Sequence, residues 1–417
     1  MSSEQPQPPG VVVLYNRSDN LVKGDARDLI ADQGVIKCAE TIAAALQSRG
    51  QRTALAPIWA EPPLLSDESP GSGPPRRRLN GRTCDVELAL AAYPPAEWVV
   101  FNLGEGLEGR LFEEVRIAWV LESMGYRFTG NDAEALGRST NKVRAKLALA
   151  ERGVPTPAWL AFQHPNQVDE SVAGCLPFPA IVKPVAEDAS QGIGPDAVVY
   201  NLRGLRERVA YVVETYRQVA LAEAFVVGRE FNVSLWGDPV KVLPLSEIDF
   251  SRFSDPYARI VSFSAKWEEE SFEYRNMPVL CPAPVDRELG TRITRTARQA
   301  WAAMGCRGYA RVDMRVSPDG TPYVVEVNCN PDLSPDAGFF TASRTAGYSY
   351  EDMVGAIVQL APRRRTATDR TVARKGWAMQ SRPARSGQRL PAVQPQLWPA
   401  GMQPAALPGG NGTRARR

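Results

Sequence analysis

The segment RVDMRVSPDGTPYVVEVN, residues 311–328, brings acidic, amide and guanidinium side chains together at short spacing. Its alternating apolar residues are typical of strands, with Val312, Met314 and Val316 on one face and polar residues on the other. The central SPDG is a turn sequence. The segment therefore predicts two antiparallel strands joined as a hairpin.

The register of this hairpin decides which polar side chains meet. A turn that pairs Val316 with Thr321 places Arg311 opposite Glu326. Odd positions of the first strand then share a face with even positions of the second. Four polar side chains converge on one side: Arg311, Asp313, Glu326 and Asn328.

The chemistry of this set is that of a hard metal site. Carboxylate and amide oxygens suit Mg²⁺, with Mn²⁺ as an alternative, and the ion takes its remaining ligands from phosphates and water. A neighbouring arginine can hold a phosphate or stabilise a developing oxyanion. A ladder of salt bridges on a solvated sheet face would use the same residues, and the segment alone leaves both interpretations open.

A second candidate motif is GEGLEG, residues 104–109, which fits the G-x-G-x-x-G pattern of dinucleotide-binding turns. It follows the strand-like run Trp98 to Phe101 and precedes a helical spacing of Leu111, Val115, Ala118 and Trp119. However, an earlier strand and helix precede it, and the next strand, YRFTG, lacks the acidic end that would bind a ribose. We therefore expect a close-approach turn that faces a substrate.

The elements that must position these motifs alternate along the chain. A strand at VVVLYN and a helix over 34–50 open a unit spanning residues 10–130, which indicates an open α/β layer. The predicted buried face of that helix is Val35, Cys38, Ala39, Ile42 and Leu46.

A second unit, residues 131–219, begins with the helix of RSTNKVRAKLALAERG, whose predicted apolar face is Val143, Leu147 and Ala150. The strand FPAIVKP, a loop of small and polar residues and another helix follow. A third unit, 220–361, contains strands broken near Gly228 and the hairpin.

Composition excludes several classes of protein. The chain has one histidine, His164, so it has no multi-histidine metal site, and its six cysteines are scattered. It lacks an apolar run of membrane-spanning length and a signal peptide, so we predict no membrane partner and a cytoplasmic location.

The C-terminal tail has a composition of its own. Residues 363–417 carry a charge of +11 against an overall +2, which leaves −9 for residues 1–362. We predict that residues 362–417 are a disordered tail rich in Arg and Pro. It is either a solvated extension or a basic arm for nucleic acid or an acidic partner.

Several segments in this order resemble the ATP-grasp ligases, and most closely the D-alanine–D-alanine ligase group. They are NKVRAK, FPAIVKP with its small-residue loop, EAFVVGREF, and RVDMRV followed thirteen positions after Asp313 by EVN. The resemblance implies an ATP-grasp fold of class α/β (α+β). Its parts are a pre-ATP-grasp substrate domain (10–130), a small subdomain with a phosphate lid (131–219) and a subdomain with the Mg²⁺ site (220–361).

The resemblance also implies roles for single residues. It assigns seven positions to ATP: Lys142, Lys183, Glu187, Ser190, Glu223, Val226 and Glu230. It makes Asp313, Glu326 and Asn328 the Mg²⁺ ligands. Arg311 would stabilise a tetrahedral intermediate, and Lys266 would be the lysine of a mobile loop. Without the resemblance, such lysines are ordinarily solvated surface residues.

The implied reaction is ATP-dependent formation of an amide-type bond through an acyl phosphate. The chain departs from the family at Glu105, where the D-alanine ligases have histidine, and in EVNCNPD, which adds Asn330 and Asp332. We expect these three residues to contact substrate, and additional acid favours a cationic or amine-bearing ligand, so we do not expect D-alanine as the substrate.

Two other functions remain open at this stage. The chain could be an ATP-binding scaffold or regulatory protein that has lost turnover and recruits a partner through its basic tail. It could also be a kinase that stops at the acyl phosphate. A homodimer is common in the resembled group, and no segment dictates one here.

Overall fold

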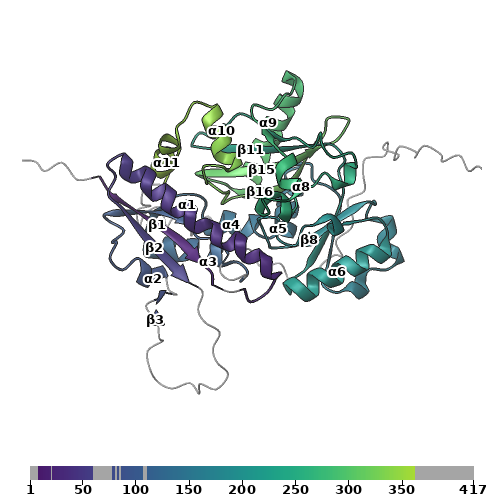
Figure 1. The fold of residues 1–417 in the computed structure, drawn as a ribbon, viewed down its shortest axis with the longest axis horizontal. Helices are drawn as coiled ribbons and strands as arrows, with labels where there is room; N and C mark the ends of the chain where they lie inside the picture. The colour runs from purple at the N-terminus through teal and green to yellow at the C-terminus, as the bar shows by residue number, and fades with distance from the viewer. Residues whose placement is uncertain are drawn as a thin grey trace, which may run out of the picture.

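The computed structural model describes residues 8–19, 21–59, 78–79, 82–83, 86–106 and 110–361. Three main sheets and the helices that cover them make up this part of the chain (Figure 1). None of the described helices is long and apolar enough to cross a membrane. The predicted disordered tail, 362–417, lies outside the described residues.

The N-terminal sheet is parallel and forms the predicted open α/β layer. Its strand order is β2 (Thr53–Trp59), β1 (Gly10–Arg17), β5 (Trp98–Leu103) and β6 (Arg127–Phe128). The helices α1 (Leu29–Ser48), α2 (Val86–Ala89) and α3 (Glu113–Met124) accompany it, and β3 (Arg78–Leu79) pairs with β4 (Arg82–Thr83). In Figure 1, α1 runs from the side of this sheet toward α6 (Leu202–Tyr216).

The buried face predicted for α1 is confirmed, whereas the predicted place of Trp119 on α3 is not. Every residue of the predicted α1 stripe is buried. On α3, Ala118 of the predicted spacing is buried, but Trp119 is 61% exposed, and Ile117 and Leu121 are buried in its place. The predicted place of the large indole is wrong because spacing alone does not fix the rotation of a helix on its sheet.

The middle sheet carries the strand that ends in Lys183. It is antiparallel, in the order β7 (Trp159–Phe162), β10 (Ala220–Ala224), β8 (Ala180–Pro184) and β9 (Val198–Val199), and α6 covers one face. The helices α4 (Ala133–Ser139) and α5 (Lys142–Glu151) precede it in the chain. The side chain of Asn141 caps the N-terminus of α5.

The predicted apolar face of α5 is wrong. Leu147 is 44% exposed, whereas the buried residues of α5 are Lys142, Ala145, Lys146 and Leu149. Two lysines are buried on this face because carboxylates from other elements meet them, as described below. An apolar pattern cannot indicate such a face, since lysines are ordinarily exposed.

The C-terminal sheet carries the hairpin. Its order is β14 (Val279–Leu280), β13 (Ser246–Ile248), β11 (Arg229–Trp236), β15 (Tyr309–Val316) and β16 (Pro322–Asn328), with β12 (Lys241–Val242) beside β11. Helix α9 (Arg287–Met304) packs on this sheet. The remaining helices are α7 (Phe263–Trp267), α8 (Phe272–Asn276), α10 (Gly338–Thr345) and α11 (Tyr350–Gln359).

The predicted hairpin exists, but its register differs. Arg311 pairs with Asn328 and Asp313 with Glu326, because the register shifts between Asp313 and Met314. This bulge adds one residue to β16 and returns its even positions to the face of the odd positions of β15. The four polar residues therefore share one face as predicted, with different partners.

Gly228 joins β10 to β11 at a place where no side chain fits. An added Cβ would lie 1.9 Å from the backbone oxygen of Val316, at the end of the neighbouring strand β15. The break in the strands predicted near Gly228 is therefore required by a close backbone approach.

Replacement of this glycine provides a test of the close approach. Gly228→Ala is expected to lower the free energy of unfolding by about 1–3 kcal/mol, measured by chemical denaturation, because the backbone must move to admit the methyl group. Gly174→Ala is the control, since no atom lies within 4 Å of its added Cβ. An equal effect of the two substitutions would contradict this explanation.

Candidate active site

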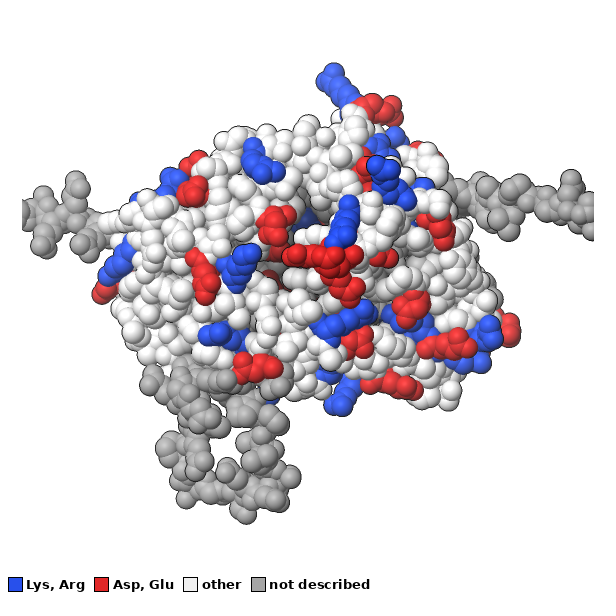
Figure 2. Space-filling model, viewed as in Figure 1, with Lys and Arg blue, Asp and Glu red and all other residues white. Residues whose placement is uncertain are grey.

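A cavity of about 640 Å³ lies where the sheets and α1 meet, and it gathers every residue proposed from the sequence. Fifteen predicted residues line it: Glu105, Lys142, Lys183, Glu187, Ser190, Glu223, Val226, Glu230, Lys266, Arg311, Asp313, Glu326, Asn328, Asn330 and Asp332. Figure 2 shows a hollow at the centre of one face, with acidic side chains beside it. The structure thus places together residues that are up to 227 positions apart, as Glu105 and Asp332 show.

A buried cluster of three charges lies at one end of the cavity. Glu223 on β10 forms ion pairs with Lys183 on β8 and with Lys146 on α5, at 2.5 Å for Lys146. The exposed fraction of each of the three side chains is 5% or less. Sequence reasoning missed Lys146, although it lies four residues after Lys142 on the same helical face.

Lys142 connects this end of the cavity to the hairpin. Its ammonium group lies 2.8 Å from the Glu326 carboxylate and also donates to the backbone carbonyl of Glu187. Burial would raise the pKa of the Glu326 carboxyl, but Lys142 and Lys183 outweigh it and lower the pKa to about 2. Glu326 is therefore ionised at neutral pH.

Arg311 and Asp313 form a second charged pair beside it. The guanidinium donates to both carboxylate oxygens of Asp313, at 2.7 and 2.8 Å, and Asn232 on β11 donates to one of them at 2.8 Å. Burial disfavours the charge on Arg311, yet Asp313 raises its pKa above the usual range. These bonds fix the orientation of the Asp313 carboxylate toward the shared polar face.

The donor set on this face fits a magnesium ion. Asp313 and Glu326 are cross-strand neighbours, Asn328 follows on the same face, and Glu326 is held in its ionised form. Mg²⁺ usually needs only one or two carboxylates, because phosphates and water complete its shell. Among the described residues, no three His, Cys, Asp or Glu side chains gather as a metal cluster, and the fit is that of two carboxylates and an amide completed by phosphates.

Arg315 organises the wall that contains Val226 and Glu230. Its guanidinium donates to Glu230 at 2.7 Å and to the Val226 carbonyl at 3.1 Å, and it lies over the rings of Phe225 and Phe250. Sequence reasoning did not select Arg315. Arg315 lies on the polar face of the first hairpin strand, and that position could have identified it as a site residue.

The loop between β8 and β9 covers the charged cluster. Ala189 and Ser190 have positive φ angles, 49° and 63°, a conformation that residues with side chains rarely adopt. The Ser190 hydroxyl donates to the Val261 carbonyl at 2.8 Å, and the Trp267 indole donates to the Ala189 carbonyl at 3.0 Å. Lys266, which the resemblance assigned to a mobile loop, lies in the short helix α7, and this helix packs on the lid.

Lys266 lies within this packed region. Desolvation and the nearby charge of Arg311 lower the pKa of its ammonium group. The Lys266 ammonium thus lies close to the positive charge of Arg311. Anionic phosphates bound nearby would neutralise both charges.

The opposite end of the cavity is acidic. The backbone of Glu105 donates to Asn16 at 3.0 Å, and Asn16 donates to the Gly106 carbonyl at 2.8 Å. Desolvation, Asp188 and Asp332 raise the pKa of the Glu105 carboxyl well above its usual range. Asn16 was missed from the sequence, where it ends the first strand without a motif.

The two residues added after EVN behave differently. Asn330 donates to the Gly104 carbonyl at 3.3 Å, so it ties the hairpin loop to the glycine turn. Asp332 accepts hydrogen bonds from the backbone and hydroxyl of Ser334, at 2.8 and 2.6 Å, and is exposed. Asp332 thus holds its own loop as well as lining the cavity.

The glycine turn itself shows the predicted close approach. An added Cβ at Gly104 would lie 2.7 Å from the Ile117 side chain. Residues 107–109 of the motif lie outside the described part of the chain.

Comparisons with known proteins agree with this geometry. The family described as D-ala D-ala ligase C-terminus matches residues 148–359. A D-alanine–D-alanine ligase of Carboxydothermus hydrogenoformans is 32% identical over 263 residues, which cover 61% of this chain and 79% of that protein. The uncharacterized protein y4sG of Sinorhizobium fredii is 33% identical over 267 residues, covering 64% of this chain and 75% of its own.

Solved structures show the same fold. D-alanine–D-alanine ligase from Bacillus anthracis, crystallised with ATP, superposes with a TM-score of 0.60 at 20% identity, covering 85% of this chain and 97% of that one. VanG D-Ala:D-Ser ligase from Enterococcus faecalis also gives 0.60, at 18% identity, over 85% and 100% of the two chains. This chain has the ATP-grasp fold and belongs to the D-alanine–D-alanine ligase family.

Asp32 on α1 accepts a hydrogen bond from Gln191 of the lid, at 3.5 Å. Burial raises the pKa of its carboxyl to about 7, although Ser18 donates a hydrogen bond to it at 2.9 Å. Because the folded-state pKa lies above that of the unfolded chain, Asp32 costs no stability in acid. The cost grows as the pH rises to about 7.

Asp32→Asn tests this titration. The substitution is expected to leave the free energy of unfolding nearly unchanged near pH 4, and to increase it by on the order of 3 kcal/mol near pH 8. Denaturant unfolding of both proteins at the two pH values gives the difference. A substitution effect that is the same at both pH values would contradict the raised pKa.

Proposed function

We propose that this protein is an ATP- and Mg²⁺-dependent carboxylate–amine ligase that forms an amide or peptide-type bond through an acyl phosphate. The observation that carries the proposal is the cavity in which buried lysines, the polar face of the hairpin and an acidic end lie together. Family membership supports the class of reaction.

In this proposal the positively charged end binds the nucleotide. Lys142 and Lys183 contact ATP phosphates, with Glu187 and Ser190 in the lid above them. Glu223 and the Val226 backbone bind adenine. Glu230 binds the ribose hydroxyls, and its bond to Arg315 fixes the carboxylate for that task. Glu223 also pairs with both buried lysines, so each ammonium has a carboxylate partner.

Asp313, Glu326 and Asn328 are the proposed ligands of Mg²⁺, or of Mn²⁺ in its place. When bound, the ion neutralises phosphate charge during phosphoryl transfer. Lys142, which now pairs with Glu326, is close enough to share phosphate oxygens with such a site.

Arg311 and Lys266 are the proposed catalytic residues. Phosphoryl transfer from ATP to a carboxylate gives the acyl phosphate, and an amine then attacks its carbonyl carbon and releases phosphate. Arg311 would stabilise the oxyanion of the tetrahedral intermediate, since Asp313 fixes the plane of its guanidinium. Lys266 would hold the transferred phosphoryl group by charge.

The acidic end is proposed to recognise an amine-bearing substrate. Glu105 and Asp332 line this end, and burial among other carboxylates raises the pKa of Glu105. A substrate ammonium would supply a balancing positive charge. The cavity also extends along α1 past Lys37 to Thr41, which leaves space for a substrate longer than D-alanine.

A scaffold that has lost turnover is the weaker alternative. Binding ATP alone does not require Arg311, Asp313, Glu326 and Asn328 on one face, yet all four are present and oriented. A cytoplasmic location and a homodimer remain predictions. No role is assigned to the basic tail.

The proposal is tested by ADP release over a panel of amino acids and short peptides with ATP and Mg²⁺. Activity is expected with a cationic amino acid or peptide, and little with D-alanine alone. Asp313→Asn should reduce it about 100-fold or more, because metal and arginine both lose their carboxylate. ATP binding without ADP release, equal in wild type and Asp313→Asn, would support the scaffold. Hydroxamate formation without an amide product would indicate a kinase.

Glu105 is the residue we expect to decide substrate range. Glu105→His replaces the acidic side chain by the residue found in the D-alanine ligases, so it should shift preference away from amine-bearing substrates while ATP affinity stays unchanged. Relative kcat/KM across the panel measures the shift. An unchanged range would move the specificity role to Asn330 and Asp332.

A further inference from the structure

The segment between β1 and α1, residues 23–28, lies against the nucleotide end of the cavity although no predicted site residue comes from it. Lys23 forms an ion pair with Glu187 of the lid, and the two side chains are 8% and 10% exposed. The backbone of Gly24 donates to the Thr215 carbonyl at 3.0 Å, near the end of α6. A part of the chain that precedes the ATP-grasp region thus contacts its lid.

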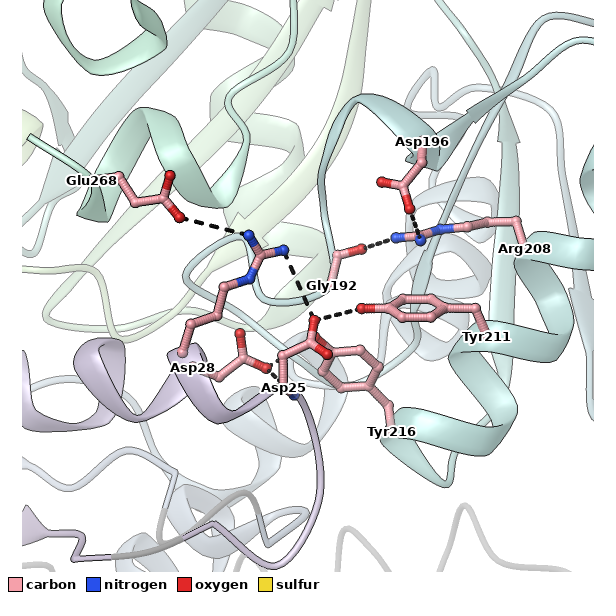
Figure 3. A network of polar contacts seen from close by, with 9 residues as sticks. Asp25, Asp28, Gly192, Asp196, Arg208, Tyr211, Tyr216 and Glu268 are labelled. Atoms are coloured by element: carbon pink, nitrogen blue, oxygen red, sulfur yellow. Dashed lines mark hydrogen bonds and ion pairs between the residues drawn. The ribbon is translucent and has the colours of Figure 1, made fainter. Parts of the chain in front are cut away.

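Two tyrosines of α6 anchor this segment. The Tyr211 hydroxyl donates to Asp25 at 2.6 Å, and the Tyr216 hydroxyl donates to Asp28 at 2.9 Å (Figure 3). Tyr216 and Asp28 are 0% and 1% exposed. Hydrogen bonds to carboxylates are stronger than those between neutral groups, and buried ones are costly to break. The segment is therefore fixed on α6.

Further contacts connect this segment, through Glu187, to Lys142 of the proposed ATP site. Gln218 donates to the Glu187 carboxylate at 2.5 Å, on the oxygen that also pairs with Lys23. The backbone carbonyl of the same Glu187 accepts a hydrogen bond from Lys142. Glu187 therefore contacts Lys23 and Gln218 through its side chain and Lys142 through its backbone, so the place of this one residue links the segment to the Lys142 ammonium.

The other end of the lid is fixed to the same helix. Arg208 on α6 donates to the Gly192 carbonyl at 2.6 Å, and Figure 3 shows this contact close to the tyrosine anchors. Between the two ends, Ala189 and Ser190 hold positive φ angles that only surrounding contacts maintain. The lid thus depends on both of its ends being held.

We propose that Lys23 is a positioning residue for the nucleotide site, and that residues 23–28 form a clasp whose anchors at Asp25 and Asp28 set its place. Lys23 acts through Glu187 on the lid and on Lys142, without lining the cavity itself. The inference rests on the proposed function, because it assigns the lid to ATP. It adds that the N-terminal part of the chain controls how well the lid closes.

The experiment uses the full chain and two measurements. One is the dissociation constant of a non-hydrolysable ATP analogue with Mg²⁺, by calorimetry, and the other is hydrogen exchange of amides 186–193. The variants are Lys23→Met, which removes the charge, Lys23→Arg, which keeps it, and Tyr211→Phe, which removes one anchor. Arg49→Met is the matched control, because it breaks an ion pair with Asp352 at the other end of α1.

Lys23→Met is expected to weaken analogue binding roughly tenfold and to speed lid exchange by a similar factor, as loss of one buried charged contact implies. Lys23→Arg should restore both, Tyr211→Phe should give a smaller change in the same direction, and Arg49→Met should change neither. Exchange in the N-terminal sheet should stay at the wild-type rate in every variant.

The outcomes separate the two proposals. If the wild type does not bind the analogue, the proposed function fails, while the clasp still predicts faster lid exchange in ligand-free Lys23→Met. If the wild type binds but Lys23→Met and Tyr211→Phe keep wild-type affinity and lid exchange, the clasp is wrong. A loss in Lys23→Met that Lys23→Arg does not restore would also overturn the charge-based role.

Discussion

The ion cluster of Glu223 with Lys146 and Lys183 is the interaction on which the nucleotide end of the cavity depends. Glu223 lies on β10, at the centre of the middle sheet, and its two partners come from α5 and β8. Three buried charges are tolerated only because each is paired, and removal of one partner from such a cluster typically costs about 3–5 kcal/mol. The cluster therefore fixes α5 against the sheet. That packing in turn places Lys142 next to Glu326.

A division of charge along the cavity follows from this arrangement. Lysines and Arg311 gather beside the hairpin and the lid, whereas Glu105 and Asp332 line the other end. Desolvation strengthens each of these local fields, since few water molecules screen them. A substrate with an anionic group and an ammonium group would therefore bind in one orientation, with its carboxylate toward the lysines. The hairpin bulge and the clasp of residues 23–28 both affect the end of the cavity where the lysines lie. The bulge sets the polar face of the proposed metal ligands, and the clasp contacts the lid.

The sequence was sufficient to select fifteen of the residues that line the cavity, because motifs of a known family mark them in order, but it did not select Arg315. It also predicted the open α/β layer and the buried stripe of α1, where apolar spacing is regular. It did not predict the hairpin register, because the interpretation took the second strand as regular, although the adjacent Val324 and Val325 break the alternation where the bulge lies. The lysine face of α5 was predicted wrongly because burial of a charge depends on a partner distant in sequence, such as Glu223 for Lys146. Contacts like that of Lys23 with Glu187, 164 positions apart, are set by how elements pack.

Transfer of oxygen from the substrate carboxylate to phosphate tests the central claim most directly. The protein would be incubated with ATP, Mg²⁺ and a mixture of cationic amino acids that carry ¹⁸O in their carboxylates. The released phosphate would then be analysed by mass spectrometry. An acyl phosphate intermediate requires that phosphate carry one labelled oxygen for each amide bond formed. Phosphate released without label, or none above the Asp313→Asn background, would contradict the account.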